Sequence, residues 1–304
     1  MSTRSSSSAA PRDSEPLSSQ LARRRIPSSL PRDILSFLLH YPGQRDDPAA
    51  DANLRFYRNE GAARPRRSRC EELQRELKGN WDELEDRHDF VQWLFPIREQ
   101  GVNWSAQPLQ LHEIEAIKSD PAAMARLLES YRIILAFYGL RLVSPSTGEL
   151  ALADAVPAPA QENYRQRFRN LERNWHNFLR VTRILKCLGE FDLTQHPPSF
   201  LLFLLALQSR APSTLALGGP YLDSPALVRS FDDYWRWCVR DDDERALVAR
   251  VRDGVRSGTD GWGVDEYREW VRGKAGEDSG EQSAEESRAS AAEAGVETGQ
   301  EDKS

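Results

Sequence analysis

The segment from Asp120 to Gly139, DPAAMARLLESYRIILAFYG, constrains the fold more than any other part of this chain. Asp120 can cap the free amide groups that begin a helix, Pro121 suits its first position, and Gly139 suits its end. Between these signals, apolar side chains recur at the spacing of one helical face: Met124, Leu127, Leu128, Tyr131, Ile134, Leu135 and Tyr138. The segment therefore predicts a helix with one face in a core.

A second long helix is predicted from Gln161 to Leu188, where Gly189 ends the pattern. Its apolar positions alternate steps of four and three, through Tyr164, Phe168, Leu171, Trp175, Phe178, Thr182 and Leu185. The length of this helix predicts a central position in the fold. Shorter amphipathic helices are predicted over 68–78, 106–118 and 241–256, and another that opens at Ser224. For 148–156, a loop is favoured over a short β-ribbon.

These segments predict an all-α fold, a single multi-helix globular domain over residues 30–272 with disordered tails. The chain has 304 residues, of which 39% are apolar, enough to bury a core. The Ser/Arg-rich residues 1–29 and the acidic residues 273–304 are too poor in large apolar side chains to offset the entropy of ordering. A separate small helical subdomain over 208–272 is the alternative.

The charge balance argues against a nucleic-acid-binding protein. The net charge is −6, and residues 273–304 alone hold nine acidic and three basic side chains. The folded part is therefore close to neutral, whereas nucleic-acid binding over a whole domain shows as a basic excess. Basic clusters at 23–25 and 64–69 suggest nuclear import, or are solvated loops.

Cysteine and histidine spacing gives no sign of a disulfide framework or a metal site. Cys70, Cys187 and Cys238 are an odd, widely spaced set, which fits a reducing intracellular compartment. The longest apolar run, 200–207, is far shorter than the roughly 20 residues of a spanning helix, so any membrane association is expected to be peripheral. We find no phosphate-binding glycine loop, and therefore predict no cofactor, no catalytic residues and no enzymatic activity.

The stretch from His88 to Trp104, HDFVQWLFPIREQGVNW, joins a predicted helix end to an aromatic loop. Val91 and Phe95 are assigned to the core. Carboxylates on one side of the helix are expected to meet the amino terminus of a peptide while aromatic rings cover its apolar side chains. The predicted recognition surface consists of Asp82, Glu85, Asp89, Trp93 and Trp104. The alternative is that both tryptophans only seal the loop against the core.

A basic ridge forms a second candidate surface on the long helix. It carries Arg169, Arg173, His176, Arg180 and Arg183, of which Arg173, Arg180 and Arg183 are the partner-binding candidates. Such a ridge can meet phosphate or an acidic partner. Alternatively, Glu172 and neighbouring acidic helices neutralise it.

Three blocks of sequence resemble a known family. They are NLRFYRNE at 53–60, NWDELEDRHDFVQWLFPIREQGVNWSA at 80–106 and HNFLRVTRILKCLGEF at 176–191. In this order and separation they resemble the opioid growth factor receptor conserved domain. The resemblance extends over about 53–207, about half of the chain, and fades beyond Leu207.

The resemblance implies an intracellular, non-enzymatic receptor for the peptide methionine-enkephalin that restrains cell growth and associates with nuclear and membrane fractions. The chain departs from the vertebrate members in its acidic tail, where they carry Pro-rich repeats. We therefore expect a peptide-binding signalling module in the nucleus and cytoplasm. The alternative is an intracellular helical adaptor or scaffold with no small ligand.

Overall fold

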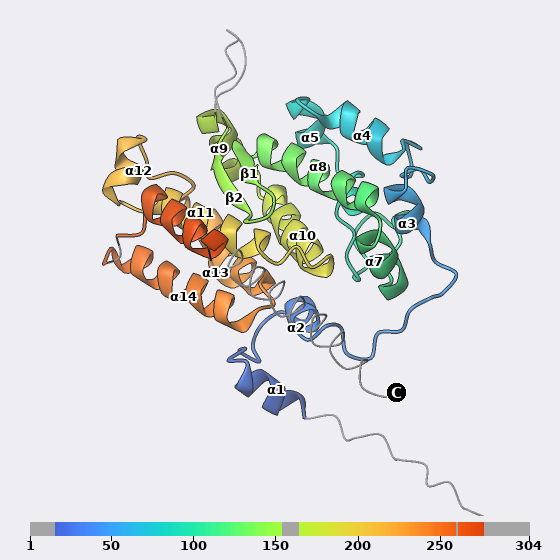
Figure 1. The fold of residues 1–304 in the computed structure, drawn as a ribbon, viewed down its shortest axis with the longest axis horizontal. Helices are drawn as coiled ribbons and strands as arrows, with labels where there is room; N and C mark the ends of the chain where they lie inside the picture. Colours follow the sequence, from blue (N-terminus) through green and yellow to red (C-terminus); the bar gives the residue numbers. More distant parts are fainter. Residues whose placement is uncertain (1–15, 154–163, 260, 277–304) are drawn as a thin grey trace, which may run out of the picture.

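The structure is a computed structural model that describes residues 16–153, 164–259 and 261–276 (Figure 1). Most of the two predicted disordered tails lies outside these residues. The α-helices are α1 (Leu17–Arg23), α2 (Arg32–Leu38), α3 (Ala52–Tyr57), α4 (Cys70–Leu77), α5 (Trp81–Asp86), α6 (Val91–Leu94), α7 (Leu111–Lys118), α8 (Pro121–Phe137), α9 (Tyr164–Arg173), α10 (His176–Glu190), α11 (His196–Gln208), α12 (Pro212–Ala216), α13 (Pro225–Asp233) and α14 (Asp242–Ser257). A 3-10 helix, η1 (Trp235–Cys238), follows α13, and residues 264–276 are also helical.

The predicted all-α fold is confirmed, with a single helical core built around α11. All thirteen residues of α11 are buried, as expected of a helix that is apolar on every side. On one side of it lies α14, and on another α10 (Figure 1). The rings of Phe203 in α11 and Tyr267 lie 4.8 Å apart, so residues after 208 share this core.

The helix predicted from Asp120 to Gly139 is confirmed as α8. The Oδ1 atom of Asp120 accepts hydrogen bonds from the backbone N–H groups of Ala122 and Ala123 at 3.0 and 3.2 Å. Gly139 follows the helix at φ +80°, and a Cβ there would lie 2.9 Å from the carbonyl oxygen of Tyr164. Both end signals therefore act locally, as the sequence predicted.

The prediction of a single long helix over 161–188 was wrong. Residues before Tyr164 are not described, and the remainder is divided into α9 and α10 at Asn174. The Asn174 side chain donates to Oδ1 of Asn170 at 2.7 Å, and such local side-chain bonds compete with helix continuation. Trp175, predicted to be part of the buried stripe, is 69% exposed. The central helix is α11 instead.

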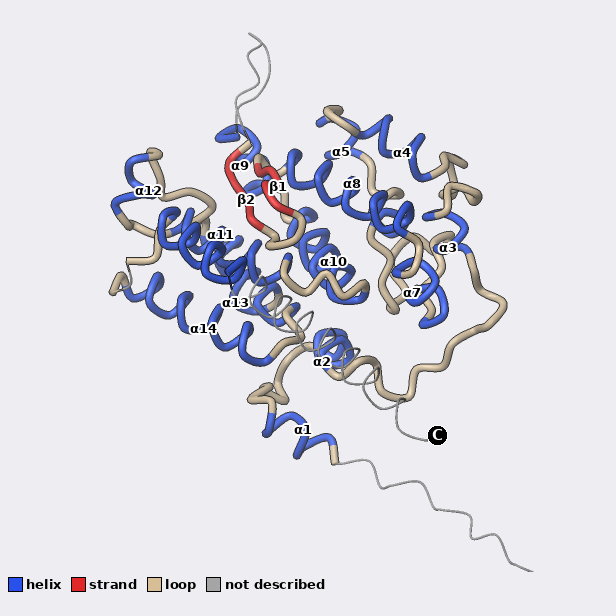
Figure 2. The backbone as a smooth tube through the Cα atoms, in the orientation of Figure 1, coloured by secondary structure: helices blue, strands red, loops and turns tan. Residues whose placement is uncertain are grey.

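The prediction of a loop over 148–156 was also wrong for the residues of this segment that the structure describes. Strand β2 (Glu149–Leu152) pairs antiparallel with β1 (Leu140–Ser144), and both are drawn in red in Figure 2. Residues 154–156 lie outside the described residues. The hairpin is held from a distance: Leu150 N–H donates to Tyr267 Oη at 2.8 Å, and Ser199 Oγ donates to the carbonyl oxygen of Gly148 at 2.6 Å. Because these bonds join residues far apart in the chain, local sequence patterns could not predict them.

The domain boundary predicted at residue 30 is too late. Leu21 of α1 and Ile26 are buried. Arg24 binds Asp242 at the start of α14, with Nε 3.0 Å from Oδ1, and donates to the carbonyl oxygen of Arg240 at 2.6 Å. Residues 16–29 therefore pack on the helical domain.

A buried carboxylate fixes the segment that leads towards the site. Glu113 of α7 is fully buried and accepts hydrogen bonds from the backbone and side chain of Asn53 at 2.8 and 2.9 Å. It also accepts from Leu54 N–H at 3.1 Å and from Gln107 Nε2 at 3.0 Å. The long loop between α2 and α3, visible in Figure 2, ends against this cluster. Asn53, from the first family-like block, thus has a structural role.

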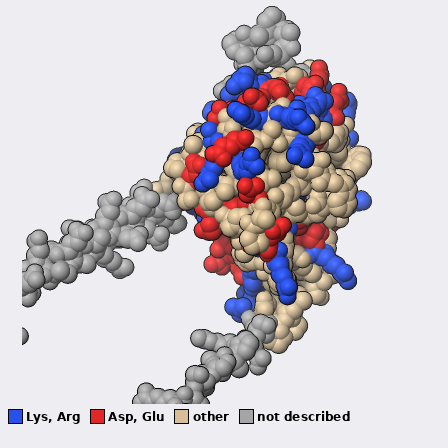
Figure 3. Space-filling view, turned by 90° about the vertical axis from the view of Figure 1, so that its right-hand side faces the viewer, with Lys and Arg blue, Asp and Glu red and all other residues tan. Residues whose placement is uncertain are grey.

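No helix within 16–153, 164–259 or 261–276 has the length and apolar character needed to cross a membrane. On the face that carries α3, α4 and α7, basic and acidic side chains alternate rather than separating into patches (Figure 3). The cluster at 64–69 is folded into a turn closed by a hydrogen bond from Ala63 N–H to the carbonyl oxygen of Ser68 at 2.8 Å.

Candidate functional site

Asp82, Glu85 and Asp89 do not share one side of a helix. α5 ends at Asp86, and the extended backbone of Arg87, with ψ 140°, changes the direction of the chain. Asp89 therefore lies beyond the helix, while Asp82 is exposed to solvent. The geometric premise of the predicted acidic surface was wrong, because the helix is only six residues long.

Two of these carboxylates are bound within the protein. Oε2 of Glu85 accepts hydrogen bonds from Nδ2 of Asn170 at 2.7 Å and of Asn177 at 3.2 Å. Oδ1 of Asp89 lies 3.1 Å from Nε of Arg87. Glu85 thus links α5 to α9 and α10, whereas Asp89 pairs with Arg87 just after α5.

The two predicted tryptophans have opposite environments. Trp93 is 4% exposed, and its indole Nε1 donates to the carbonyl oxygen of Arg64 at 3.1 Å. It belongs to the core, together with Val91 and Phe95, whose predicted burial is confirmed. Trp104 is 85% exposed and leaves a large apolar ring in solvent. The loop is thus sealed by one tryptophan and displays the other.

The Gly-Val-Asn-Trp sequence forms a tightly held turn. A Cβ on Gly101 would lie 2.4 to 2.6 Å from the amide atoms of Gln92, so only glycine allows this close approach. The Gln92 side chain accepts from Asn103 N–H at 2.6 Å and donates to its carbonyl oxygen at 3.0 Å. The turn thereby presents Val102, 93% exposed, next to Trp104.

The three arginines of the predicted basic ridge differ in their environments. Arg173 is exposed. Arg180 is 4% exposed, and its guanidinium donates to the carbonyl oxygens of Leu84 and Arg87, each at 2.6 Å. Arg180 therefore satisfies backbone groups at the end of α5 and does not form a free surface. Arg183 faces a pocket.

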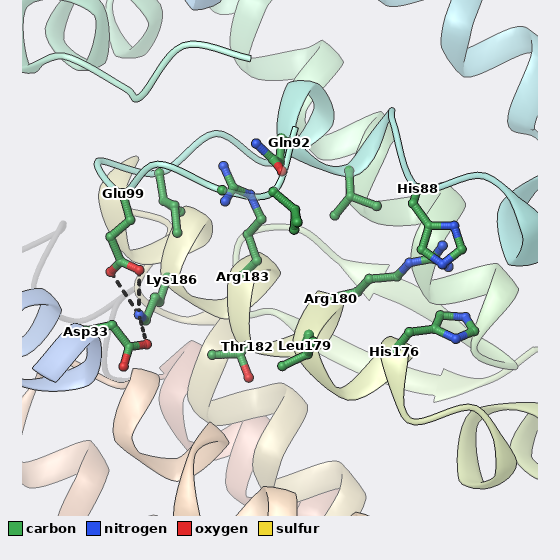
Figure 4. A pocket seen from close by; sticks show the side chains of 14 residues that line it. Asp33, His88, Gln92, Glu99, His176, Leu179, Arg180, Thr182, Arg183 and Lys186 are labelled. Atoms are coloured by element: carbon green, nitrogen blue, oxygen red, sulfur yellow. Dashed lines mark hydrogen bonds and ion pairs between the residues drawn. The ribbon is translucent and has the colours of Figure 1, made fainter. Parts of the chain in front are cut away.

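This pocket, of about 270 Å³, lies between α10 and the segment 88–102, with α2 at one end (Figure 4). Leu179 of α10 and Val102 of the turn line it, although both are mostly exposed, at 63% and 93%. Trp175 lies one helical turn before Leu179 and is also exposed. The pocket is therefore bordered by apolar side chains from two segments. Of the four exposed apolar side chains in these two segments, Leu179 and Val102 line the pocket, and Trp175 and Trp104 lie four and two residues away from them in the sequence. We call Trp175, Leu179, Val102 and Trp104 the apolar rim.

Arg183 is the cation at the middle of the pocket (Figure 4). Its Nε donates to the carbonyl oxygen of Phe95 at 2.8 Å. Within the described part of the chain, its two Nη atoms have no hydrogen-bond acceptor and no carboxylate within ion-pair distance. Burial lowers the pKa of Arg183 to about 10, so the side chain is cationic at neutral pH but poorly solvated.

Lys186 closes one end of the pocket and is fully engaged. Its Nζ lies 2.8 Å from Oε1 of Glu99 and 2.9 Å from Oδ2 of Asp33, as the dashed lines in Figure 4 mark. Burial disfavours the charged ammonium, but the net effect, to which the Glu99 and Asp33 carboxylates contribute, raises the pKa of Lys186 above its usual range. This end presents charges that are already paired.

Two imidazole rings form the other end. The ring centroids of His88 and His176 lie 5.0 Å apart, and Nε2 of His176 lies 2.7 Å from Oε1 of Glu85. Burial lowers the pKa of His176 despite this carboxylate, so the ring is neutral at pH 7. The site therefore combines an apolar rim with one cation whose Nη atoms are unpaired among the described residues.

The described residues contain no group of three or more His, Cys, Asp or Glu side chains that could hold a metal ion. Cys70, Cys187 and Cys238 are buried, and burial raises the pKa of each thiol, which keeps it neutral. Their arrangement thus favours packing over nucleophilic chemistry.

The sequence reading missed Leu179, Val102 and Gln92. A signal existed for Leu179, because it falls outside the stripe formed by Phe178, Thr182 and Leu185 while sharing a helical face with Trp175. The role of Gln92 depends on the fold of the turn, and no spacing in the sequence reveals it.

Comparison with known proteins matches residues 46–259 to the opioid growth factor receptor conserved region. The prediction that the resemblance fades beyond Leu207 was therefore wrong. The chain is 40% identical to the opioid growth factor receptor of Homo sapiens over 211 residues, 69% of this chain and 28% of that protein. It is 32% identical to opioid growth factor receptor-like protein 1 of Rattus norvegicus over 248 residues, 80% of this chain and 49% of that protein. The chain thus spans between about a quarter and half of the length of these relatives. No solved structure matches it.

Proposed function

Because this chain belongs to the opioid growth factor receptor family, we propose that it is a non-enzymatic receptor module that binds a short peptide in the α10 pocket. The ligand proposed from the family is a peptide of the methionine-enkephalin type, and the outcome of binding is regulation of cell growth. The observation that carries the proposal is a pocket that joins charged side chains to the exposed apolar side chains of Leu179 and Val102. Pockets that bind ligands combine mostly apolar walls with a few placed polar groups.

The apolar rim supports binding because it is costly to expose. Trp175, Leu179, Val102 and Trp104 are 69%, 63%, 93% and 85% exposed, respectively. Leu179 belongs to α10, Trp175 immediately precedes that helix, and Val102 and Trp104 belong to the turn that Gln92 and Gly101 fix. Exposed apolar side chains gathered at one place mark interaction surfaces.

The charged groups of the pocket support binding rather than chemistry. Arg180 is held by backbone carbonyl oxygens, and Lys186 by Glu99 and Asp33. Cations held in this way keep their protons and their positions, so they are poorly placed to act as an acid or a base. A non-enzymatic role is therefore part of the proposal, and substrate turnover in an activity screen would contradict it.

Calorimetry of the full chain with methionine-enkephalin and with a scrambled peptide of the same composition tests the proposal. The account expects binding of methionine-enkephalin and weaker binding of the scrambled form. Leu179→Asp should abolish binding, because it puts a charge into the rim. Leu215→Asp is the matched control, since Leu215 of α12 is 48% exposed and does not line the pocket. Equal heats for both peptides would contradict the proposal.

A second candidate function is an adaptor or scaffold that binds another protein and no small ligand. The exposure of Trp175 and Trp104 favours it, because aromatic residues are enriched in protein interfaces. An absence of peptide binding, together with a protein complex that Leu179→Asp disrupts, would favour this function.

The proposed location follows from the family and not from the pocket. We propose a nuclear and cytoplasmic protein with peripheral membrane association. Of the basic clusters that suggested nuclear import, 64–69 is folded into a closed turn and Arg24 of 23–25 is bound to Asp242. Microscopy of the tagged chain in cells tests the location, and exclusion from the nucleus would contradict it.

A further inference from the structure

We propose that the α10 pocket recognises the free C-terminal carboxylate of its peptide, and that the Nη atoms of Arg183 bind it. This inference rests on the proposed function, because it assigns one end of the bound peptide to one residue. It reverses the polarity that the sequence predicted, in which protein carboxylates were to meet the amino terminus.

Arg183 is the cation of the pocket with donors to spare. Among the three cations that line it, Arg180 donates to backbone carbonyl oxygens and Lys186 is bound by two carboxylates. Arg183 has one hydrogen bond, from Nε to the carbonyl oxygen of Phe95. Its Nη atoms have no acceptor within the described ranges 16–153, 164–259 and 261–276.

The half-buried guanidinium of Arg183 favours a carboxylate ligand. Burial disfavours its charge, as the lowered pKa of Arg183 shows, and an anion restores the lost interaction. The bond from Nε to Phe95 also fixes the orientation of the planar group. A fixed guanidinium binds a carboxylate through two parallel hydrogen bonds, which the point charge of a lysine cannot reproduce.

The size and lining of the pocket suit the carboxylate of a C-terminal residue. The volume of about 270 Å³ lies below the roughly 300–1,000 Å³ of pockets that enclose drug-sized ligands, so it suits a single terminal residue. Leu179, Val91 and Ile97 line the same space as Arg183. In a C-terminal residue the carboxylate and the side chain are attached to the same Cα atom. An apolar C-terminal residue can therefore place its carboxylate against Arg183 and its side chain against the apolar wall at the same time.

The carboxylates of the pocket are already paired and leave no matching site for an amino terminus. The carboxylates that line it, Asp33 and Glu99, both bind Lys186. Glu85, one of the carboxylates predicted to hold the peptide, is bound by Asn170, Asn177 and His176. The arrangement therefore favours the carboxyl end of the peptide.

The experiment compares methionine-enkephalin with its C-terminal amide by calorimetry on the full-length protein. A bidentate charge-assisted pair predicts that amidation weakens binding about tenfold or more. Arg183→Gln should weaken the free acid to the level of the amide and leave the amide unchanged, and Arg183→Lys should restore only part of the loss. Arg173→Gln is the matched control on the neighbouring helix, because Arg173 is exposed and does not line the pocket.

A smaller probe separates this inference from the proposed function. N-acetyl-methionine and N-acetyl-methioninamide differ only in the carboxylate, and NMR can follow the amide signals of residues 179–186 with each. The account predicts shifts with the acid that are lost in Arg183→Gln and absent with the amide. If these shifts occur but methionine-enkephalin does not bind, the carboxylate site stands and the assigned peptide fails.

Two results would overturn the inference. One is equal binding of the acid and amide forms of methionine-enkephalin to the unmodified protein, a comparison that does not depend on any variant folding. The other is an absence of shifts at residues 179–186 with millimolar N-acetyl-methionine.

Discussion

The side chain of Gln92 is hydrogen-bonded to both backbone groups of Asn103, accepting from the N–H at 2.6 Å and donating to the carbonyl oxygen at 3.0 Å. This pair holds the turn that carries the exposed Trp104 and Val102, of which Val102 lines the pocket beside α10. An amide side chain that pairs with a backbone in this way substitutes for a β-ladder partner. The shape of the candidate site thus depends on one residue of α6 that does not belong to the apolar rim.

The contact between Gly101 and Gln92 gives the first prediction. Gly101→Ala should lower the free energy of unfolding by about 1–3 kcal/mol, because the added Cβ displaces the Gln92 amide group from its two hydrogen bonds to Asn103. It should also weaken peptide binding, since the turn must move. Urea unfolding and calorimetry measure the two effects. Gly261→Ala is the control, because a Cβ there meets no atom within 4 Å.

The second prediction separates the two tryptophans. Trp93→Ala should lower the free energy of unfolding by about 3–5 kcal/mol, because it empties a buried site and removes the bond to Arg64. Trp104→Ala should change it by less than about 0.5 kcal/mol and weaken peptide binding. Chemical denaturation with parallel calorimetry distinguishes them. Equal destabilisation by the two substitutions would contradict the assigned environments.

The third prediction concerns the buried Glu113 cluster. Glu113→Gln should destabilise the fold by at least about 2 kcal/mol, because an amide nitrogen then faces donors that now bind a carboxylate. Glu115→Gln, on the same helix but exposed, should change stability by less than about 0.5 kcal/mol. Thermal and urea unfolding of both variants provide the comparison. Similar stabilities would show that the cluster does not fix α3 against α7.

The fourth prediction is a pH dependence due to His196. Burial lowers the pKa of this fully buried ring from 6.5 to about 4. Between pH 6.5 and pH 4 the folded state therefore binds fewer protons than the unfolded state. The contribution of the neutral His196 to the free energy of unfolding is fully present above pH 6.5 and is lost as the pH falls towards 4. The loss should reach about 3 kcal/mol by pH 4.

His196→Leu should remove this part of the pH dependence, because leucine has no proton to gain. The quantity to compare is the difference in the free energy of unfolding between the variant and the unmodified protein, measured by urea at pH 7 and pH 4.5. That difference should shift in favour of the variant at the lower pH. A difference that does not change with pH would contradict a neutral buried His196.

Sequence patterns predicted the parts of the fold that local signals determine. The start and end of α8 depend on Asp120 and Gly139, which act within one turn of the helix, so they could be identified from their spacing. Burial of Val91 and Phe95 was predicted from their apolar spacing and is confirmed, although α5 and α6 are separate helices. The break between α9 and α10 was missed, because it depends on the side-chain bond between Asn174 and Asn170.

The site was harder to predict, because its residues differ only in their tertiary surroundings. Arg180 and Arg183 look alike in sequence, one turn apart on the same helix. The carbonyl oxygens of α5 lie against Arg180 and leave Arg183 with donors to spare, which follows from the packing of distant segments. The aromatic loop could be identified from its sequence. The exposure of Trp104 and the burial of Trp93 could not, because they depend on the turn at Gly101.

NMR mapping of methionine-enkephalin on the isotopically labelled protein tests the central claim most directly, because it locates the ligand without a substitution. The account predicts that the backbone amide signals perturbed at saturation belong to residues 97–104 and 175–186, with the largest change near Leu179 and Arg183. Perturbation confined to another surface, such as the cavity beside Arg236 and Trp237, or no perturbation at all, would contradict it.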